Sequence, residues 1–171
     1  MESVAVWLIC DEGKQKGKVL LQKRAQKDIV NGEVKVQSSP GICQAACNGK
    51  VDFGESPMEA VKREIEEELG KAFADSFHFS SLVRFYTGSY TFNGEAAVGY
   101  NFYSFINLQQ QNLIKLHAGA EPHFIAVLDS DFAKIKINGD KNADPETGIV
   151  LFRDQYKALK ILLEILMNTT L

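Results

Sequence analysis

This sequence has few cysteines, few prolines and no long hydrophobic run. Three cysteines and four prolines among 171 residues are too few for a disulfide-stapled framework or a proline-rich linker. No apolar run reaches the roughly 18 residues that a membrane-spanning helix needs. Positive charge is not in excess either, because 19 lysines and arginines stand against 22 acidic residues and leave a net charge of −3. We therefore expect neither a membrane segment nor a broad nucleic-acid-binding surface.

The cysteines are odd in number, which favours reduced thiols and a cytoplasmic protein. Cys43 and Cys47 have the spacing of half a zinc site, but no second pair exists. The three histidines, which show no metal-ligand spacing, are His78, His117 and His123. We expect Cys10, Cys43 and Cys47 to be reduced and to bind no metal. The start of the chain, Met1–Ser3, lacks the basic region of a secretory signal.

The remaining composition is typical of a globular protein with a mixed α and β pattern. Hydrophobic residues make up 45% and charged residues 24%, and the length fits one domain over residues 1–171. Strands are predicted over Val4–Cys10, Lys18–Gln22, Ile42–Cys47, Leu82–Tyr86, Ser89–Phe92, Gly99–Ile106 and Phe124–Leu128. The first two are expected to pair as a hairpin, and Asn93-Gly94 to form a second hairpin turn. Residues 34–36 fit a strand or a loop, residues 23–31 are predicted to be irregular, and Asn48-Gly49 is typical of a turn.

The best-delimited helix begins after Ser56 and ends at Leu69. Ser56 is a good helix cap, and Pro57 suits the first helical position. Apolar residues four positions apart give the helix one core-facing stripe, namely Val61, Ile65 and Leu69. Gly70 follows this stripe and can adopt the left-handed conformation that ends many helices. A final helix with a wide apolar face is expected from a cap at Asp154 to about Met167.

The first helix is unusually acidic. Residues 55–68 hold six glutamates, opposed only by Lys62 and Arg63. Glu64, Glu67 and Glu68 lie at positions i, i+3 and i+4, so their carboxylates share one helical face. Like charges on one face repel each other, and a divalent cation such as Mg²⁺ or Mn²⁺ would turn that repulsion into ligation. The alternative is a solvated acidic face, which is the commoner reason for a glutamate-rich helix.

The spacing around this helix resembles a known signature. Read from Gly49, the pattern is Gly49-x5-Glu55-x7-Arg63-Glu64-Ile65-x-Glu67-Glu68-x-Gly70. It resembles the Nudix box of the Nudix hydrolases, and every fixed position matches. Two residues depart from the family's usual pattern, Lys71 in place of an aliphatic residue and Asn48 in place of a common second glycine. The resemblance implies an α/β (α+β) fold, an α/β/α sandwich with a mixed β-sheet.

The resemblance also implies a reaction. Glu64, Glu67 and Glu68 would bind Mg²⁺ or Mn²⁺, with the Gly49 carbonyl as a further ligand. Either Glu67 or Glu64 would take the proton of the attacking water. The implied activity is metal-dependent hydrolysis of a nucleoside diphosphate linked to another moiety. Metal ions assist such a reaction because they neutralise the phosphate oxygens that repel the nucleophile.

Further charged residues have roles implied by the same resemblance. We count Arg63 among the catalytic residues. Its implied role is an ion pair with Glu55 that stabilises the conformation of the loop and helix. The family often adds an acidic residue outside the box, and Glu121 is our candidate because it precedes the predicted strand Phe124–Leu128. The rival candidate is Glu95, which lies beside a predicted hairpin turn where a solvated glutamate is common.

Two other functions stay open at this point. The basic stretch Lys23–Ile29 is similar to isopentenyl diphosphate isomerase-like Nudix proteins, but Cys43 and Cys47 lack the Cys-His-Pro setting of that enzyme. A non-catalytic, ligand-sensing Nudix domain is the second alternative, although such domains often lose the box glutamates that this chain keeps. The sequence leaves open the base, the leaving group and the oligomeric state, with a homodimer as one alternative.

Overall fold

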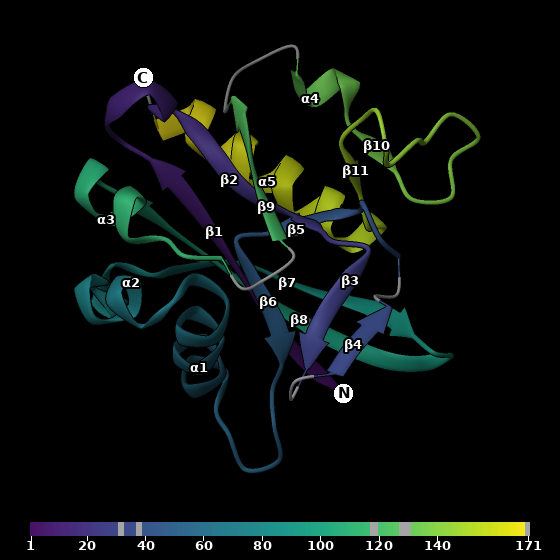
Figure 1. Ribbon diagram of the computed structural model, residues 1–171, viewed down its shortest axis with the longest axis horizontal. Coiled ribbons are helices and arrows are strands. Elements are labelled where there is room, and N and C mark those ends of the chain that lie inside the picture. The colour runs from purple at the N-terminus through teal and green to yellow at the C-terminus, as the bar shows by residue number, and fades with distance from the viewer. Residues whose placement is uncertain (31–32, 37–38, 117–119, 127–130, 170–171) are drawn as a thin grey trace.

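The fold of this chain, obtained as a computed structural model, is described for residues 1–30, 33–36, 39–116, 120–126 and 131–169 (Figure 1). A mixed sheet of nine strands runs through its centre. These strands are β1 (Glu2–Cys10), β2 (Lys18–Arg24), β5 (Cys43–Ala45), β6 (Cys47–Lys50), β7 (Val83–Phe92), β8 (Glu95–Ile106), β9 (Ala120–Ala126), β10 (Lys136–Ile137) and β11 (Val150–Leu151). A separate two-stranded sheet consists of β3 (Lys27–Val30) and β4 (Glu33–Val36).

The helices of the described residues lie on the two faces of the large sheet or at its ends. They are α1 (Pro57–Leu69), α2 (Lys71–Ser76), α3 (Leu108–Leu113), α4 (Asp131–Lys134) and α5 (Arg153–Thr169), with short 3₁₀ turns at Gly13–Gln15 and Phe79–Ser81. The strands follow the order β10-β11-β5-β2-β1-β8-β7, while β6 also pairs with β1 and β9 with β2. No described helix is long and apolar enough to cross a bilayer.

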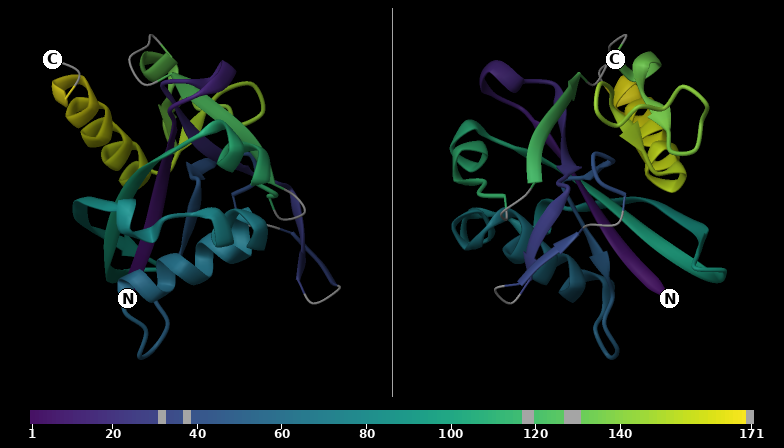
Figure 2. Two further views of the ribbon diagram at one scale, coloured as in Figure 1. Left: turned by 90° about the vertical axis from the view of Figure 1, so that its left-hand side faces the viewer. Right: turned by 45° about the vertical axis from the view of Figure 1, so that its right-hand side comes forward.

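Strand β1 shows why both faces of the sheet are covered. Every residue of Val4–Cys10 is buried, and successive side chains of a strand point to opposite faces. Leu8 belongs to the apolar cluster that contains Ile65 of α1. Trp7 belongs to a second cluster, which contains Leu162 of α5. Helices α1 and α5 therefore cover opposite faces of the sheet (Figure 2), which confirms the predicted α/β/α sandwich with a mixed sheet.

The two central strands diverge along their length. β1 pairs antiparallel with β2 at Leu8–Leu20 and the next pair, but from Ser3 to Val6 its partner on that side is β6. β2 pairs with β5 instead. Since Ala46 alone separates β5 from β6, the chain passes from one central strand to the other within a single residue. This β5–β6 bend lies next to α1, which packs on β6.

Several local predictions are confirmed. The β1–β2 hairpin is present, and α1 has its predicted beginning and end. Asn93 and Gly94 form the turn between β7 and β8, with φ angles of 50° and 84°. Positive φ angles at both central residues match the twist of paired strands, and asparagine and glycine tolerate them best.

Other local predictions are wrong. The segment predicted to be irregular contains β3, which pairs with β4. Residues 34–36, for which a strand and a loop were both open, belong to β4. Asn48-Gly49 lies within β6, paired with Ala5 and Val4, rather than in a turn. The two strands predicted between Leu82 and Phe92 are one strand, β7, with an irregular register between Arg84 and Tyr86. At Asn48-Gly49, long-range pairing with β1 outweighs the local turn signal.

The helix and strand ends also need correction. Gly70 has φ 91° and ψ 151°, a conformation that glycine tolerates but that differs from the left-handed helical one. α5 begins at Arg153, so Asp154 lies in its first turn instead of capping it. β9 begins at Ala120, four residues before the predicted strand, and Glu121 therefore lies within a strand rather than before one. The predicted end at Leu128 falls outside the described residues.

Candidate functional site

Helix α1 is fixed at its start by local contacts. The side chain of Ser56 accepts a hydrogen bond from the Glu59 backbone N–H, and the Glu59 carboxylate accepts one from the Ser56 backbone N–H at 2.8 Å. This capping box satisfies two backbone donors that a helix start otherwise leaves unpaired. Pro57 occupies the first turn, where a missing N–H costs nothing. The helix that carries the box glutamates therefore has a well-defined first turn.

Arg63 joins α1 to the loop that precedes it. Its Nε donates to Glu55 Oε1 at 3.1 Å and its Nη2 to Glu55 Oε2 at 3.0 Å. Nη2 also donates to the Lys50 carbonyl at 2.8 Å, and the Asp52 backbone N–H donates to Glu55 Oε2 at 3.0 Å. The hydrogen bonds from Arg63 hold the pKa of Glu55 below its usual range. The ion pair implied by the box is thus present and bidentate, a geometry that fixes the loop as well as the charge.

Glu64 is the most buried of the three glutamates on the shared face, at 7% exposure. Its Oε1 accepts from Arg63 Nη1 at 2.6 Å. Burial raises its pKa, while the hydrogen bond from Arg63 opposes the rise. The carboxylate lies directly against Gly49, because a Cβ atom at that residue would overlap the Glu64 carboxylate oxygens. Only glycine leaves room for this approach of a strand backbone to a helix side chain.

Glu68 is bound to the β5–β6 bend. Its Oε2 accepts hydrogen bonds from the Asn48 backbone N–H at 3.2 Å and from Gln22 Nε2 at 3.3 Å. Gln22 Nε2 also donates to the carbonyl of Ala46 at the bend itself. Burial, followed by the nearby charge of Glu64, raises the pKa of Glu68 to about 8. Two carboxylates therefore lie close enough in a desolvated place to disfavour each other's charge.

Glu67 differs from these two because its side chain is 59% exposed. Its Oε2 lies 3.4 Å from Arg63 Nη1, an i, i+4 pair on the helix surface. Such a pair contributes only tenths of a kcal/mol. The three glutamates of one helical face therefore differ in exposure: Glu64 is buried and Glu68 partly buried against β6, whereas Glu67 faces the solvent.

The residues of this site fit a hard divalent cation in donor type. Buried carboxylates with mutual repulsion are oxygen donors that Mg²⁺ and Mn²⁺ prefer, and the Gly49 backbone lies beside one of them. Among the residues that the structure describes, however, no three aspartate, glutamate, histidine or cysteine side chains are assembled as a ready metal cage. Arg63 holds Glu64, whereas Gln22 and Asn48 hold Glu68, so a cation would compete with these donors.

The two candidates for the extra acid lie on different strands. Glu121 lies in β9 with its backbone paired to Lys23 of β2, next to the Pro122–Gln22 pair. The side chain of Glu121 lies outside what the structure describes. Glu95 is exposed at the start of β8, opposite Phe92 across the hairpin turn. β9 therefore adjoins the strand that carries Gln22, a direct partner of Glu68.

Three residues with direct or indirect contact to Glu68 were absent from the candidates drawn from the sequence: Gln22, Asn48 as a donor, and Gln155 of α5. Gln22 and Gln155 are 1% and 5% exposed. The sequence did offer one signal, namely a glutamine at a core-facing position: Gln22 follows the buried leucines of β2, and Gln155 lies one helical turn before Leu159 in α5. A buried amide must find partners, but the sequence does not say which ones.

Lys71, Cys10 and Cys43 stay apart from these contacts, whereas Cys47 lies near the glutamates: burial, followed by the charges of Glu68 and Glu64, raises the pKa of its thiol. Lys71 begins α2 and pairs with Asp75 at 3.0 Å on the exposed surface. Cys43 and Cys47 belong to the apolar clusters on opposite faces of the sheet. All three cysteines are free and buried, and burial raises the pKa of Cys10 and Cys43 to about 11. Desolvation of this kind makes thiols unreactive.

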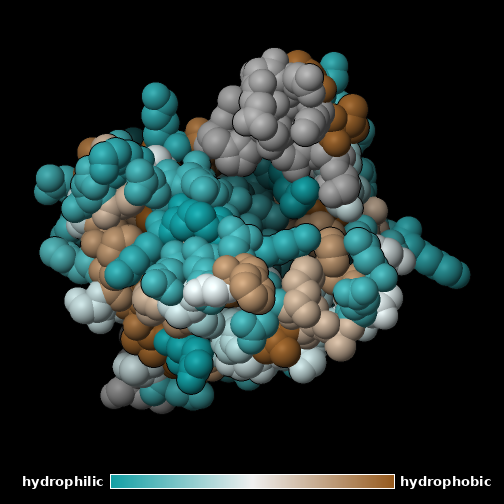
Figure 3. All heavy atoms as spheres, turned by 90° about the horizontal axis from the view of Figure 1, so that it is seen from below, coloured by the Kyte–Doolittle hydropathy of each residue, from teal (hydrophilic) through white to brown (hydrophobic). Residues whose placement is uncertain are grey.

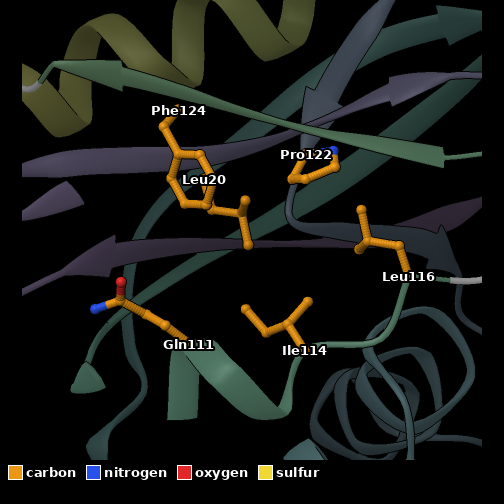
Figure 4. Close-up of a pocket in the computed structure, with 6 residues that line it drawn as sticks. All are labelled: Leu20, Gln111, Ile114, Leu116, Pro122 and Phe124. Atoms are coloured by element: carbon orange, nitrogen blue, oxygen red, sulfur yellow. The ribbon is translucent and has the colours of Figure 1, made fainter. Parts of the chain in front are cut away.

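An apolar cavity of about 250 Å³ lies on the α1 side of the sheet (Figure 4). It is lined by Leu20, Gln111, Ile114, Leu116, Pro122 and Phe124. The face seen from below carries hydrophobic side chains scattered among hydrophilic ones, at least where the structure describes it (Figure 3). Neither feature brings charged groups together, so the cluster around Glu64 and Glu68 remains the candidate site.

Comparison with known proteins agrees with the box. A family model described as the NUDIX domain matches residues 1–136. No curated protein matches the sequence.

Among solved structures, the chain is similar to a C. elegans Ap4A hydrolase binary complex, at 14% identity and a TM-score of 0.59, with 98% of each chain covered. It is also similar to the NUDIX domain of Shewanella oneidensis NrtR complexed with ADP ribose, at 14% identity and a TM-score of 0.62 over 97% of this chain and 88% of that one. A third is the E. coli dihydroneopterin triphosphate pyrophosphohydrolase, at 15% identity and a TM-score of 0.59 over 96% and 95%. At such identities the likeness establishes the fold.

Proposed function

The chain belongs to the Nudix family and is a hydrolase of diphosphate bonds, and we propose that its substrate is a nucleoside diphosphate linked to a second group and that it requires Mg²⁺ or Mn²⁺. The observation that carries the proposal is the pair of carboxylates that α1 holds against the β5–β6 bend, the buried Glu64 and the partly buried Glu68. Burying two repelling carboxylates costs free energy unless a ligand offsets it. A cation is the ligand that does so.

The substrate class has separate support. Two of the three similar structures are named for Ap4A and for ADP ribose, and both compounds are nucleoside diphosphates linked to a further group; the third is named for dihydroneopterin triphosphate. The isopentenyl diphosphate isomerase-like alternative gains no support from Cys43 and Cys47, which are buried on opposite faces of the sheet. A sensing domain without catalysis is disfavoured because all box glutamates are kept.

Each residue of the box has a distinct part in the proposed reaction. A divalent cation, if held at this site, would supply charge neutralisation of the diphosphate oxygens and a lower pKa for the attacking water. Glu64, Glu67 and Glu68, with the Gly49 carbonyl, would hold the cation. Glu67 is also proposed as the better proton acceptor for the attacking water, because it is exposed and its contact with Arg63 Nη1, at 3.4 Å, is longer than the 2.6 Å contact of Glu64.

Arg63 acts on the shape of the site. Its hydrogen bonds to Glu55 and to the Lys50 carbonyl fix the loop between β6 and α1. Because Gly49 directly precedes Lys50 in β6, these bonds also help to fix the position of Gly49. Glu121 is proposed as the additional acid, because its strand β9 adjoins Gln22. Residues 1–171 are proposed to act as one domain, since α5 buries its apolar face against the sheet. The three free cysteines support a cytoplasmic location.

The test is a panel of substrates with and without Mg²⁺. Purified protein is incubated with ADP-ribose, Ap4A, nucleotide sugars and isopentenyl diphosphate, and the products are separated by chromatography. We expect Mg²⁺-dependent release of a nucleoside monophosphate from at least one nucleoside diphosphate derivative. Folded protein that cleaves nothing in the panel would overturn the proposal, and isomerisation of isopentenyl diphosphate without hydrolysis would select the alternative enzyme.

A further inference from the structure

Behind Glu68, a short series of hydrogen bonds crosses the sheet. Gln155 lies in the first turn of α5, on the face opposite α1. Its Oε1 accepts a hydrogen bond from the Ala45 backbone N–H at 3.0 Å, and its Nε2 donates to Asn48 Oδ1 at 3.4 Å. The backbone N–H of Asn48 donates to Glu68 Oε2 at 3.2 Å. Helix α5 is thereby connected to a carboxylate of α1.

These contacts all meet at the β5–β6 bend. Ala45 is the last residue of β5 and Asn48 the second of β6, so one amide group of Gln155 bridges both sides of the bend. Gln22 holds the middle of the bend, through the carbonyl of Ala46. Regular strand pairing is interrupted where the chain changes partners, and buried backbone groups there need other partners. The two glutamines provide them.

We propose that Gln155 is a positioning residue, which holds Glu68 in its cation-binding orientation through Asn48. The inference rests on the proposed function, because it assigns Glu68 to the cation. Asn48 precedes Gly49, the first residue of the box, so the Gln155–Asn48 contact lies outside the box itself.

The physical reason is the fixed position of one N–H group. The Asn48 N–H reaches Glu68 only while β6 keeps its present course. Without the Gln155 amide, the first residues of β6 lose their hydrogen bond to α5. The Asn48 N–H can then move away from the Glu68 carboxylate. Partners that orient metal ligands typically change metal affinity by 10- to 100-fold when they are removed.

The experiment compares two buried glutamines. Gln155→Met keeps the approximate volume but removes both hydrogen bonds. Gln110→Met is the matched control, because Gln110 is 8% exposed and its Nε2 donates to the Ser76 carbonyl at 3.2 Å, within the contacts of α2 and α3. Mn²⁺ affinity of the substrate-free protein is measured by electron paramagnetic resonance of free Mn²⁺, beside thermal unfolding. Both variants are expected to lose thermal stability, but only Gln155→Met is expected to bind Mn²⁺ about tenfold more weakly.

A second variant tests the route through Asn48. Asn48→Ala removes the Oδ1 acceptor and keeps the backbone N–H, so it should also weaken Mn²⁺ binding, and it serves if Gln155→Met does not fold. The double variant should bind about as weakly as Gln155→Met alone, because both changes remove the same link. An Mn²⁺ affinity within twofold of wild type in Gln155→Met or Asn48→Ala, or an equal loss in Gln110→Met, would overturn the inference.

The two proposals fail in different measurements. Turnover of the substrate panel by wild-type protein decides the proposed function, whereas the ratio of Mn²⁺ dissociation constants decides the role of Gln155. Wild-type protein that binds no Mn²⁺ would overturn both.

Discussion

Replacing Gly49 with alanine should separate the activity of this protein from its stability. The added Cβ would overlap the carboxylate of Glu64, which is the far end of a flexible side chain. The carboxylate can therefore swing away while the backbone of β6 stays in place. What is lost is its 2.6 Å contact with Arg63. Since Arg63 keeps its pair with Glu55 but the Glu64 side chain is buried, we expect a cost of about 1.5–3 kcal/mol, the range for a lost hydrogen bond to a charged group.

The same displacement removes a proposed cation ligand from its place. We expect kcat to fall by roughly 10²–10³, the scale on which positioned acid–base groups contribute, and Mn²⁺ affinity to fall with it. The assay combines steady-state hydrolysis, Mn²⁺ titration and urea unfolding. Gly99→Ala is the control, because a Cβ in that strand would meet its nearest atoms at 3.5 Å, an ordinary contact. If Gly49→Ala keeps kcat and Mn²⁺ affinity within twofold of wild type, the placement of Glu64 in the site is refuted.

Three further predictions concern Asp154, the cysteines and the two candidates for the extra acid. Burial raises the pKa of Asp154 above its usual value, so the protonated side chain favours the folded state, and this stabilisation is lost as the pH rises through the folded-state pKa. Asp154→Asn should therefore raise the melting temperature at pH 7 but not at pH 3.5. A lower melting temperature of the variant at pH 7 would contradict this. Native protein at pH 8 should react with thiol reagents far more slowly than unfolded protein, because the three cysteines are buried. Rapid labelling of any cysteine in the native protein would contradict this. If the wild type bound stoichiometric zinc and a triple Cys→Ser variant did not, the expectation that the cysteines bind no metal would be wrong. Glu121→Gln should lower kcat with little change in stability while Glu95→Gln leaves kcat unchanged, and the reverse pattern in kcat would exchange the two assignments.

The sequence predicted the parts of the site that depend on neighbours along the chain. The cap at Ser56, the apolar stripe of α1 and the spacing of its glutamates are all set by helical periodicity. It also placed Arg63 and Glu55 as a pair, although only through the resemblance to the box. These predictions hold because contacts within one helix, or between a helix and its adjoining loop, need no knowledge of distant strands.

The partners of Glu68 could not be predicted in this way. Gln22, Asn48 and Gln155 come from β2, β6 and α5, and their contacts span up to 110 residues of sequence. Asn48-Gly49 has the local signature of a turn, yet pairing with β1 keeps it extended. The requirement for glycine at this place comes from the approach of Glu64, which no local pattern reveals.

The central claim is that the carboxylates of α1 work through a divalent cation. The most direct measurement is the hydrolysis rate of the best nucleoside diphosphate substrate as free Mg²⁺ is varied from millimolar levels to excess chelator, in wild type and in Glu68→Gln. We predict a wild-type rate that saturates with Mg²⁺ and vanishes with chelator, and a rate about 10²–10⁴-fold lower in Glu68→Gln at saturating Mg²⁺. Full turnover by the wild type in excess chelator would contradict the account.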